Sequence, residues 1–321
     1  MNSRLWILIA LCAALVPVAG CGDDDSGAGD GGADTDTDAD TDADADADGG
    51  ADAGSGANGA FCTENADCDS YYCVTTQSVP PDPDGACAAA LGEGEIRIMA
   101  NVRDFYSEAA IPDQEIRITG AMAAMMNPSG AAALATATTD AAGVFDISGG
   151  AEITGTGVGI VAIGEADGYY LTITGLVEPE LEGGVYPSGI RNHDIKLVSQ
   201  DKLDEWSGYL ASFSELSSYL PLGQAGAVVA RVRYVDSGEG VPGVVMTSQS
   251  ETSNALIYYL NDAEDGFDQT ATGASGIFLL FNPALAEKFV AMKDGVEVSR
   301  SPATMGQTAG SIYTNTVQVE Q

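Results

Sequence analysis

The stretch Thr139-Asp140-Ala141-Ala142-Gly143-Val144-Phe145 recurs, in altered form, as Thr272-Gly273-Ala274-Ser275-Gly276-Ile277-Phe278. Each copy has Thr, three small or polar residues, Gly, an apolar residue and Phe, which is typical of a turn that leads into a strand. Segments around the two copies keep the same order, since 95–102 matches 227–234 and 111–116 matches 241–246. The sequence therefore predicts an internal repeat, with copies at 95–198 and 225–319.

Short segments with an apolar residue at every second position fill both copies. In the first copy they cover 95–102, 115–118, 144–147, 160–163, 169–173 and 194–198, with turn residues between them. A period of two places one row of side chains in a core and the other at the surface. We therefore predict a mainly β protein with two antiparallel β-sandwich domains, at 95–198 and 225–321, in which Phe145 and Phe278 are equivalent core residues.

This repeated pattern resembles the carboxypeptidase regulatory-like, transthyretin-like sandwich family. In that family a hairpin carries Thr and then Gly-x-Phe, with the Phe pointing into the core. The resemblance implies accessory modules that are not catalytic, and some relatives bind glycans. The first copy departs from the family pattern at 120–137, an insertion rich in Ala and Met.

Residues 201–220, between the copies, change to helical spacing. Apolar residues recur there at steps of three and four: Leu203, Trp206, Leu210, Phe213, Leu216 and Leu220. Pro221 and Gly223 end the run. A helix that lies on a membrane carries Lys and Arg on its polar face, whereas this one has only Lys202 among acidic residues. We expect a linking helix within 199–224 that packs between the sandwiches, with Trp206 in the core.

The first 20 residues have the pattern of an export signal. Arg4 is followed by an apolar run to Val18, shorter than the ~20 residues of a membrane-spanning helix. Val18-Ala19-Gly20-Cys21 resembles the bacterial lipobox, whose Cys receives diacylglycerol and becomes the mature N-terminus. The resemblance implies a lipoprotein signal peptide at 1–20 and lipid, including palmitate, on Cys21. An ordinary secretory signal with an incidental Cys is the alternative.

Residues 21–60 begin with Cys21 and continue as an Asp-rich linker. Asp alternates with Thr and Ala through 34–48, and Gly-rich ends flank this tract. Such a segment has little apolar surface to bury and its charges repel, so we predict a disordered tether. The Asp-x-Asp repeat lacks the Gly and Glu of a calcium-binding EF-hand loop, and we expect no structured metal site.

Four cysteines, Cys62, Cys68, Cys73 and Cys87, fall within a short module at 61–90. The pattern resembles small cysteine-rich modules that follow acidic tethers in lipoproteins of deltaproteobacteria. An even number of cysteines in an exported chain predicts two disulfides, and zinc is the rival for four thiols. Spacing alone leaves three connectivities open, of which we favour Cys62–Cys73 with Cys68–Cys87.

The formal net charge of −36 excludes some partners. Nucleic-acid binding needs Lys and Arg to displace counterions, so we expect no nucleic-acid partner. A basic face for anionic lipids is equally disfavoured, which leaves the acyl chains on Cys21 as the contact with the membrane. Gly22 follows Cys21 in place of the Asp that signals retention in the inner membrane, so by analogy we expect the outer membrane.

Catalytic patterns are scarce in this chain. Its one histidine, His193, excludes a multi-His metal site and argues against a His-dependent triad, and we expect it on a strand at the surface. Residues 157–162 fit a dinucleotide fingerprint superficially, but no helical pattern follows. Carboxylates are abundant, and nothing places two of them across a cleft. We therefore predict no catalytic residues, no metal and no cofactor.

We expect a non-enzymatic, lipid-anchored cell-envelope protein that displays its sandwiches for structural or adhesive contact. A carbohydrate-binding module is the alternative, because strand alternation should turn one ring outward in each of the pairs Tyr169-Tyr170 and Tyr258-Tyr259. An enzyme of unrecognised type is the third hypothesis, which a buried carboxylate pair in a cleft would support. The expected partners are the membrane, through the lipid, and a glycan or another envelope protein.

Overall fold

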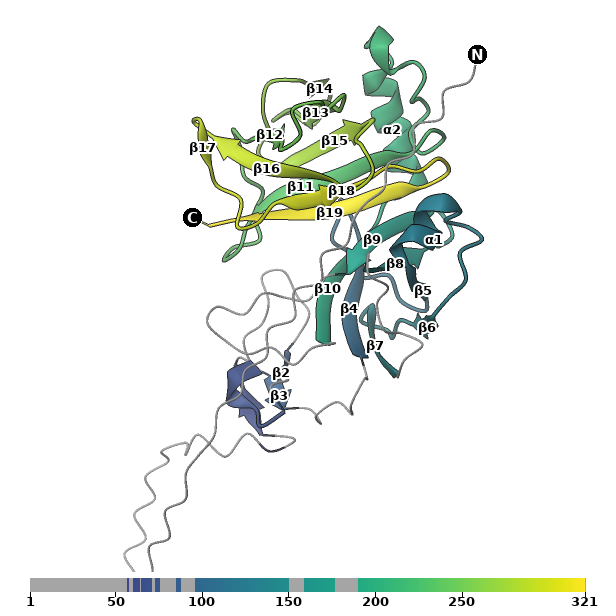
Figure 1. Ribbon diagram of the computed structural model, residues 1–321, viewed down its shortest axis with the longest axis vertical. Helices are drawn as coiled ribbons and strands as arrows, with labels where there is room; N and C mark the ends of the chain where they lie inside the picture. The colour runs from purple at the N-terminus through teal and green to yellow at the C-terminus, as the bar shows by residue number, and fades with distance from the viewer. Residues whose placement is uncertain are drawn as a thin grey trace, which may run out of the picture. The chain divides into compact units, whose positions relative to one another are not determined.

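The computed structural model describes residues 57, 60–63, 65–70, 73–75, 85–87, 96–149, 159–176 and 190–320 (Figure 1). All of them belong to the second of the two compact units into which the chain divides, residues 51–321. Within this described part no helix is both long and apolar enough to cross a membrane. The protein is mainly β, as the alternating segments predict.

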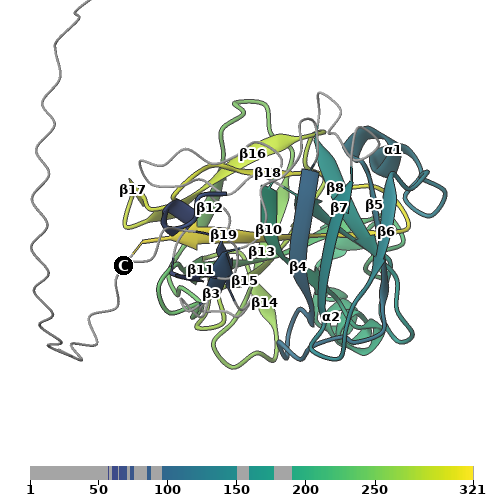
Figure 2. The same ribbon diagram turned by 90° about the horizontal axis from the view of Figure 1, so that it is seen from below.

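The first sandwich consists of two layers around one core. One layer has the order β10-β4-β7, with β4 between its two neighbours (Figure 2). The other has the order β9-β8-β5-β6. The strands are β4 (Ile96–Asp104), β5 (Glu115–Gly120), β6 (Ala135–Thr138), β7 (Val144–Gly149), β8 (Ile160–Gly164), β9 (Thr172–Leu176) and β10 (Ile190–Leu197). Ile98, Ile116, Phe145 and Ile195 are among the residues that meet between the layers.

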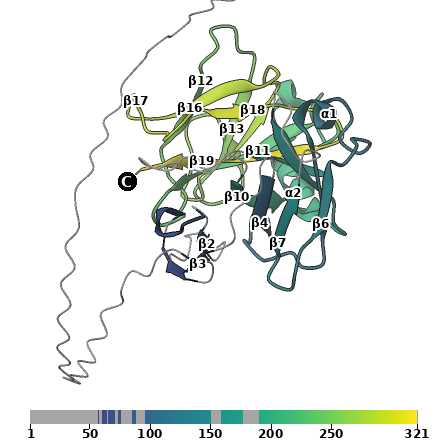
Figure 3. The same cartoon turned by 60° about the horizontal axis from the view of Figure 1, so that its bottom comes forward.

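The second sandwich repeats this arrangement. Its larger layer has the order β14-β13-β15-β11-β19, and a smaller layer of β12, β16, β17 and β18 lies over it (Figure 3). The strands are β11 (Ala227–Tyr234), β12 (Val245–Ser248), β13 (Leu256–Leu260), β14 (Phe267–Asp268), β15 (Ile277–Phe281), β16 (Glu287–Lys293), β17 (Val296–Glu297), β18 (Ala303–Met305) and β19 (Ile312–Val319). Val228, Met246, Phe278 and Phe289 are among the residues of its core.

The two sandwiches are equivalent at the level of individual backbone partners. Phe145 on β7 lies opposite Ala100 on β4, and Phe278 on β15 lies opposite Ala230 on β11. The first and last strands of each copy are also paired in parallel, β4 with β10 and β11 with β19. The repeat seen in the sequence is therefore a repeat of strand topology.

The two threonines that open the repeated stretch make the same hydrogen bonds. The Oγ1 of Thr139 donates to the carbonyl of Ile111 (2.8 Å) and accepts from the N–H of Gln114 (2.9 Å). The Oγ1 of Thr272 donates to the carbonyl of Val241 (2.6 Å) and accepts from the N–H of Val244 (2.9 Å). A hydroxyl with one donor and two lone pairs can satisfy both buried backbone groups, which explains why Thr stands there twice.

Gly143 and Gly276 both have a positive φ, 78° and 69°. A Cβ at these positions would lie 2.8 Å and 2.2 Å from the carbonyl oxygens of Val102 and Val232. The same two valines donate their N–H groups to the glycine carbonyls. The turn therefore needs glycine both for its left-handed backbone and for the close approach of β4 or β11.

A parallel pairing joins the sandwiches into one sheet. β19 pairs with β9 of the first sandwich, with Ile312 opposite Thr172 and Thr314 opposite Thr174, so that nine strands run without a break from β14 to β6 (Figure 1). The Oγ1 atoms of Thr174 and Thr314 are 2.7 Å apart across the boundary between the two sandwiches, which we call the seam. The sequence predicted two sandwiches and a linking helix, and it did not predict this shared sheet.

The linking helix is shorter than its apolar spacing suggested. α2 spans Gln200–Leu210, and after an extended Phe213 a 3₁₀ turn follows at Ser214–Leu216. The break lets the Phe213 ring pack against Tyr258, with ring centroids 4.8 Å apart. Leu203, Trp206 and Leu210 are buried against the nine-stranded sheet, which confirms the expected core position of Trp206.

The insertion at 120–137 forms the short helix α1 (Ala121–Met126) and then β6. Ala124 of α1 is buried against β8 and β9, on the face opposite the sandwich core. The Oγ1 of Thr308, from the second sandwich, donates to the carbonyl of Met125 (2.8 Å). The insertion therefore adds a second contact across the seam.

Truncating Phe145 or Phe278 to Ala is expected to lower the free energy of unfolding by ~3–5 kcal/mol, because each loses buried apolar surface and leaves a cavity. The two residues are 3% and 0% exposed. Because β9 and β19 share a sheet, each variant should still unfold in one transition, followed by circular dichroism in denaturant. Phe61, which is 68% exposed, is the matched control, and Phe61→Ala should change stability by less than ~0.5 kcal/mol. Equally small losses in both core variants would contradict the equivalence of the two copies.

Candidate functional site

The proposed lipid site, Cys21, and the Asp-rich linker lie outside the described residues. The signal-peptide prediction for 1–20 lies outside them as well. The structure therefore leaves these predictions untested.

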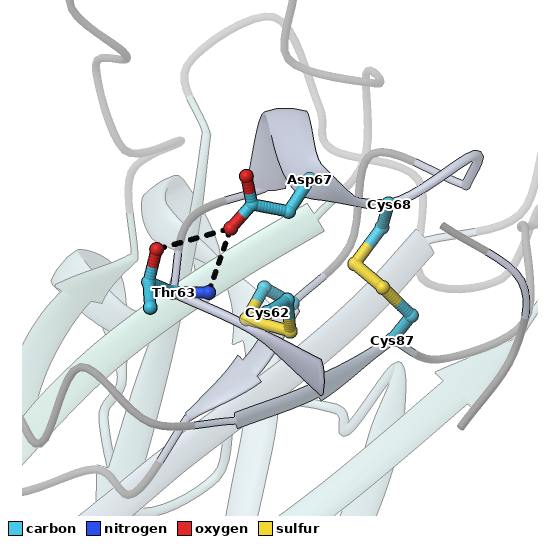
Figure 4. Close-up of a disulfide and its surroundings, with 6 residues drawn as sticks. Cys62, Thr63, Asp67, Cys68 and Cys87 are labelled. Atoms are coloured by element: carbon cyan, nitrogen blue, oxygen red, sulfur yellow. Dashed lines mark hydrogen bonds between the residues drawn. A yellow bond between two sulfur atoms is a disulfide. The ribbon is translucent and has the colours of Figure 1, made fainter. Parts of the chain in front are cut away.

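The cysteine module is described in part, and its two disulfides lie within that part. β1 (Phe61–Cys62), β2 (Cys73–Thr75) and β3 (Gly85–Cys87) form a small sheet in the order β1-β3-β2. Disulfides join Cys62 to Cys73 and Cys68 to Cys87, which is the connectivity favoured from the sequence (Figure 4). The 3₁₀ turn at Asn65–Asp67 is held to β1 by Asp67, whose Oδ2 accepts from the N–H and Oγ1 of Thr63 at 2.7 and 3.0 Å.

The sulfurs of Cys62, Cys68 and Cys73 lie within 4.8 Å of one another, as a metal site would require. Each sulfur is bonded to another sulfur, however, and zinc is bound by thiolates. Ala60 is the one other hydrophobic residue packed against the four cysteines within the described module. The crosslinks, each contributing ~3 kcal/mol for loops of this length, take the place of an apolar core.

Non-reducing peptide mapping of the intact protein should recover Cys62 linked to Cys73 and Cys68 linked to Cys87. The pairing follows from β2 and β3, which place Cys73 directly opposite Cys87 and direct each toward a different partner. A reduced and alkylated sample gives the control masses. Four free thiols, bound zinc or either of the other two connectivities would contradict the structure.

The aromatic pair Tyr258-Tyr259 does not form a ligand platform. Tyr258 is 0% and Tyr259 2% exposed, although alternation does turn them to opposite faces of β13. The expectation that one ring points outward is wrong, because α2 covers one face of the sheet and β12 with β16 covers the other. The Oη of Tyr258 donates to Oε1 of Glu215 (2.8 Å), and the Oη of Tyr259 accepts from the N–H of Met246 (2.8 Å).

Tyr169 and Tyr170 precede β9 and are half-buried. Tyr169 packs against the core of the first sandwich, and Tyr170 packs against the layer under α2. Burial raises the pKa of both hydroxyls, with Asp104 adding to the rise at Tyr169. Neither ring is presented as a flat exposed surface of the kind that glycans stack upon.

The other sequence-predicted positions fall on ordinary strands. His193 lies on β10, the outer strand of its layer, opposite Ala100. Residues 160–162 of the apparent dinucleotide pattern belong to β8. The buried carboxylates of the described residues, Asp104 and Glu287, lie on different elements, and each accepts hydrogen bonds from nearby backbone and hydroxyl groups.

A buried ionic cluster at the seam was not predicted from the sequence. Its centre is the Glu108 carboxylate, whose Oε1 accepts from Arg231 (2.8 Å) and from Arg233 on β11. The other oxygen, Oε2, pairs with Lys196 on β10. The side chains of the three cations are 5–11% exposed, and that of Glu108 is 33% exposed. We call these four residues the ionic cluster.

Strand alternation explains how the cations gather. On β11 the apolar Val228, Ala230 and Val232 point into the second sandwich, so Arg231 and Arg233 share the opposite face. On β10 Ile195 and Leu197 point into the first sandwich, which leaves Lys196 on the outer face. The sequence signal that could have indicated this cluster is the pair Arg231 and Arg233 at alternate positions of one strand. Such a pair stands out because the whole chain has only 12 Lys and Arg.

Glu108 lies in the loop 104–108, which begins at the last residue of β4. Oδ1 of Asp104 accepts from the N–H groups of Tyr106 (3.0 Å) and Ser107 (2.6 Å), an arrangement that closes the turn locally. Phe105 leaves the first sandwich and packs edge-to-face on Trp206, with ring centroids 6.5 Å apart. The loop therefore brings the Phe105 ring against Trp206 and the Glu108 carboxylate against the two arginines of β11.

The aromatic part of this contact continues beyond Phe105. Tyr106 also packs edge-on against Trp206, and its Oη donates to Oε2 of Glu264. That hydrogen bond, together with burial, raises the pKa of Tyr106 to about 12. The Arg231 guanidinium lies 5.1 Å from the centre of the Phe105 ring and donates to the Phe105 carbonyl (3.1 Å).

Burial is the largest influence on the pKa values of the three cations. Desolvation lowers the pKa of Lys196 to about 8, and Asp194, whose Oδ2 lies 3.5 Å from its Nζ, opposes the shift. Desolvation likewise lowers the pKa of Arg231 and of Arg233 to about 10. Each of these groups is therefore charged at neutral pH, at a desolvation cost that the Glu108 carboxylate offsets.

Two shallow hollows on the described surface lie away from the ionic cluster. One is lined by residues 297–300 with Glu320, and another by residues 249–250 and 284–288. The ionic cluster and the aromatic contact next to it instead form a packed seam. This arrangement can therefore hold the two sandwiches together.

No family model and no curated protein matches the chain. Similar solved structures include the Bacillus anthracis TIE protein (12% identity, TM-score 0.21, 71% of this chain and 34% of that chain) and the shaft pilin SpaA from Lactobacillus rhamnosus GG (10%, 0.19, 71% and 98%). A streptococcal ancillary pilin is also similar (8%, 0.20, 72% and 64%). The chain thus covers 34% of the TIE protein, about a third of its length. TM-scores this low carry no argument about fold or function.

Protein stability should rise with pH between about 8 and 10 because of Lys196. The folded protein releases this proton near pH 8, whereas the unfolded chain keeps it to 10.5, so in this window the unfolded state binds more protons. The expected gain is roughly 2 kcal/mol, measured by denaturant unfolding at successive pH values. Above pH 10 the raised pKa values of Tyr106 and Tyr259 and the lowered pKa values of Arg231 and Arg233 act on stability in opposite directions, so the test of Lys196 is made between pH 8 and 10.

Lys196→Met should remove the rise between pH 8 and 10, and Lys288→Met, at an exposed position on β16, should leave it unchanged. A rise that persists in Lys196→Met would show that another group causes it.

Proposed function

We propose that this chain is a non-enzymatic cell-envelope protein that presents its two sandwiches, as one body, for structural or adhesive contact. The observation that supports this most is the nine-stranded sheet, in which backbone pairing of β9 with β19 joins the sandwiches. A body held by a shared sheet, a buried ionic cluster and an aromatic contact keeps a constant shape, and such a shape suits a protein whose role is contact.

The proposal places this body on a membrane through lipid on Cys21. Its support is the sequence alone: a short apolar run, Val-Ala-Gly-Cys, and an acidic linker of about 40 residues. Extended at ~3.3 Å per residue, that linker would reach on the order of 130 Å. The anchor would be the contact with the membrane, the outer membrane by analogy, and an envelope protein or a glycan would be the contact of the body.

The glycan-binding alternative has no specific observation in its favour. Its sequence support was the expectation of outward-facing rings at Tyr258-Tyr259 and Tyr169-Tyr170, and the first pair is buried. We therefore keep the structural or adhesive role as the single proposed function.

Labelled palmitate should enter the wild-type protein expressed in a bacterial host, and Cys21→Ser should abolish the label and release the protein into the soluble fraction. Cys12→Ser is the matched control, because Cys12 lies within the proposed signal and should not carry lipid. Label that remains in Cys21→Ser, or label that disappears in Cys12→Ser, would overturn the anchor.

The contact role is tested with the unlipidated Cys21→Ser chain on beads, incubated with solubilised envelope material. Specific retention that is lost after protease treatment of the extract indicates a protein contact, and loss after periodate treatment indicates a glycan. Chemical turnover of envelope components by the same protein, without stable retention, would contradict the non-enzymatic proposal.

A further inference from the structure

Glu108 is unusual because the equivalent position of the second copy is a glycine, Gly238. Its N–H donates to the carbonyl of Asp104, and the equivalent N–H of Gly238 donates to the carbonyl of Tyr234. Both residues have a left-handed backbone, with φ of 61° and 68°. Glycine is the residue that adopts this conformation without strain, so the first copy accepts a strained glutamate where the second copy has glycine.

The side chain supplies the reason for that strain. The Glu108 carboxylate is the one acidic group that pairs with Arg231, Arg233 and Lys196 together, among the described residues. Those cations belong to β10 and β11, on the two sides of the seam. The carbonyl of Glu108 also accepts from Nη1 of Arg103 on β4 (3.2 Å). One residue therefore connects β4, β10 and β11.

The ionic cluster is poorly suited to provide stability. Its cations are desolvated, and the buried Nε atoms of Arg231 and Arg233 have no hydrogen-bond partner within the described structure. Buried ion pairs often contribute little net stability relative to apolar residues of similar size, and in some proteins they select one geometry among several. An apolar contact between sheets tolerates sliding, whereas one carboxylate bonded to three cations defines a single position.

We infer that Glu108 is an ionic latch that fixes the loop 104–108 of the first sandwich against β11 and α2 of the second. With the latch engaged, the loop 104–108 keeps Phe105 and Tyr106 on Trp206. With the latch released, the sandwiches stay folded and joined through β9 and β19, and the loop leaves its place, which uncovers Trp206. This inference does not depend on the lipid anchor or on the contact role proposed above.

Other charged groups face the latch from each element around it. They are Arg103 and Asp104 on β4, Asp194 on β10, and, next to Tyr106, Glu264 and Lys202. None of these other groups joins β10 to β11, so none of them can replace the Glu108 carboxylate as a bond across the seam.

Trp206 is a natural reporter of the latch. The chain has two tryptophans, so full-length protein carrying Trp6→Phe has Trp206 alone. In that background Glu108→Gln, which keeps the size and removes the charge, should shift Trp206 emission to longer wavelength and increase its quenching by acrylamide. Glu239→Gln is the matched control, because Glu239 is exposed in the equivalent loop of the second sandwich, and it should change neither signal.

Glu108→Gly separates latching from folding. Glycine is the residue of the second copy and fits the left-handed backbone, which offsets part of the cost of leaving three buried cations without their carboxylate, so this variant should be at least as stable as Glu108→Gln. It should nevertheless give the same increase in Trp206 quenching as Glu108→Gln. Hydrogen exchange should be about tenfold faster at Phe105 and in α2 and unchanged in β11 and β15 in both variants.

Two results would overturn the latch. Quenching of Trp206 that stays at the wild-type level in both Glu108 variants would show that the loop 104–108 keeps its place without the carboxylate. Exchange that rises throughout β11 and β15 as well would show that Glu108 supports the fold in general and does not act as a latch.

Discussion

The backbone pairing of β9 with β19 is the interaction on which the rest of this structure depends. Parallel hydrogen bonds between these strands turn two sandwiches into neighbours within one sheet. As a result β19 becomes a central strand of the shared sheet. β11, which lies between β15 and β19, is buried almost throughout, with Ala227 to Val229 covered by α2 or by the smaller layer. Both faces of β11 are covered, which is why the alternation of polar and apolar residues is weak there.

The shared sheet also explains why charge is buried in a protein with so few cations. Where β10 crosses near β11, the outer face of the first sandwich meets a face of the second, and both faces carry residues that a free sandwich would expose to water. Four of the 12 Lys and Arg residues, Arg103, Lys196, Arg231 and Arg233, lie in that seam. The acidic residues elsewhere in the chain repel like-charged partners, and the seam concentrates the opposite charge inside.

The cysteine module follows a different principle from the sandwiches. The sandwiches are stabilised by burial of apolar side chains, with Phe145 and Phe278 at equivalent core positions. The described part of the module has four half-cystines and little else to bury, so covalent bonds perform the task of a core. The same chain thus uses crosslinks where it is too short for a core and packing where it is long enough.

The sequence by itself determined the features that depend on local pattern: the internal repeat, the β class, the disulfide cysteines, and the core positions of Phe145, Phe278 and Trp206. These follow from spacing, because a turn with Thr and Gly and an alternating strand specify their own inward face. Only the tertiary structure decided that β9 and β19 share a sheet, that Tyr258 and Tyr259 are both buried, that α2 ends at Leu210, and that Glu108 binds three cations. Each of these depends on which faces of two sandwiches meet, and residues far apart in the chain meet only after folding.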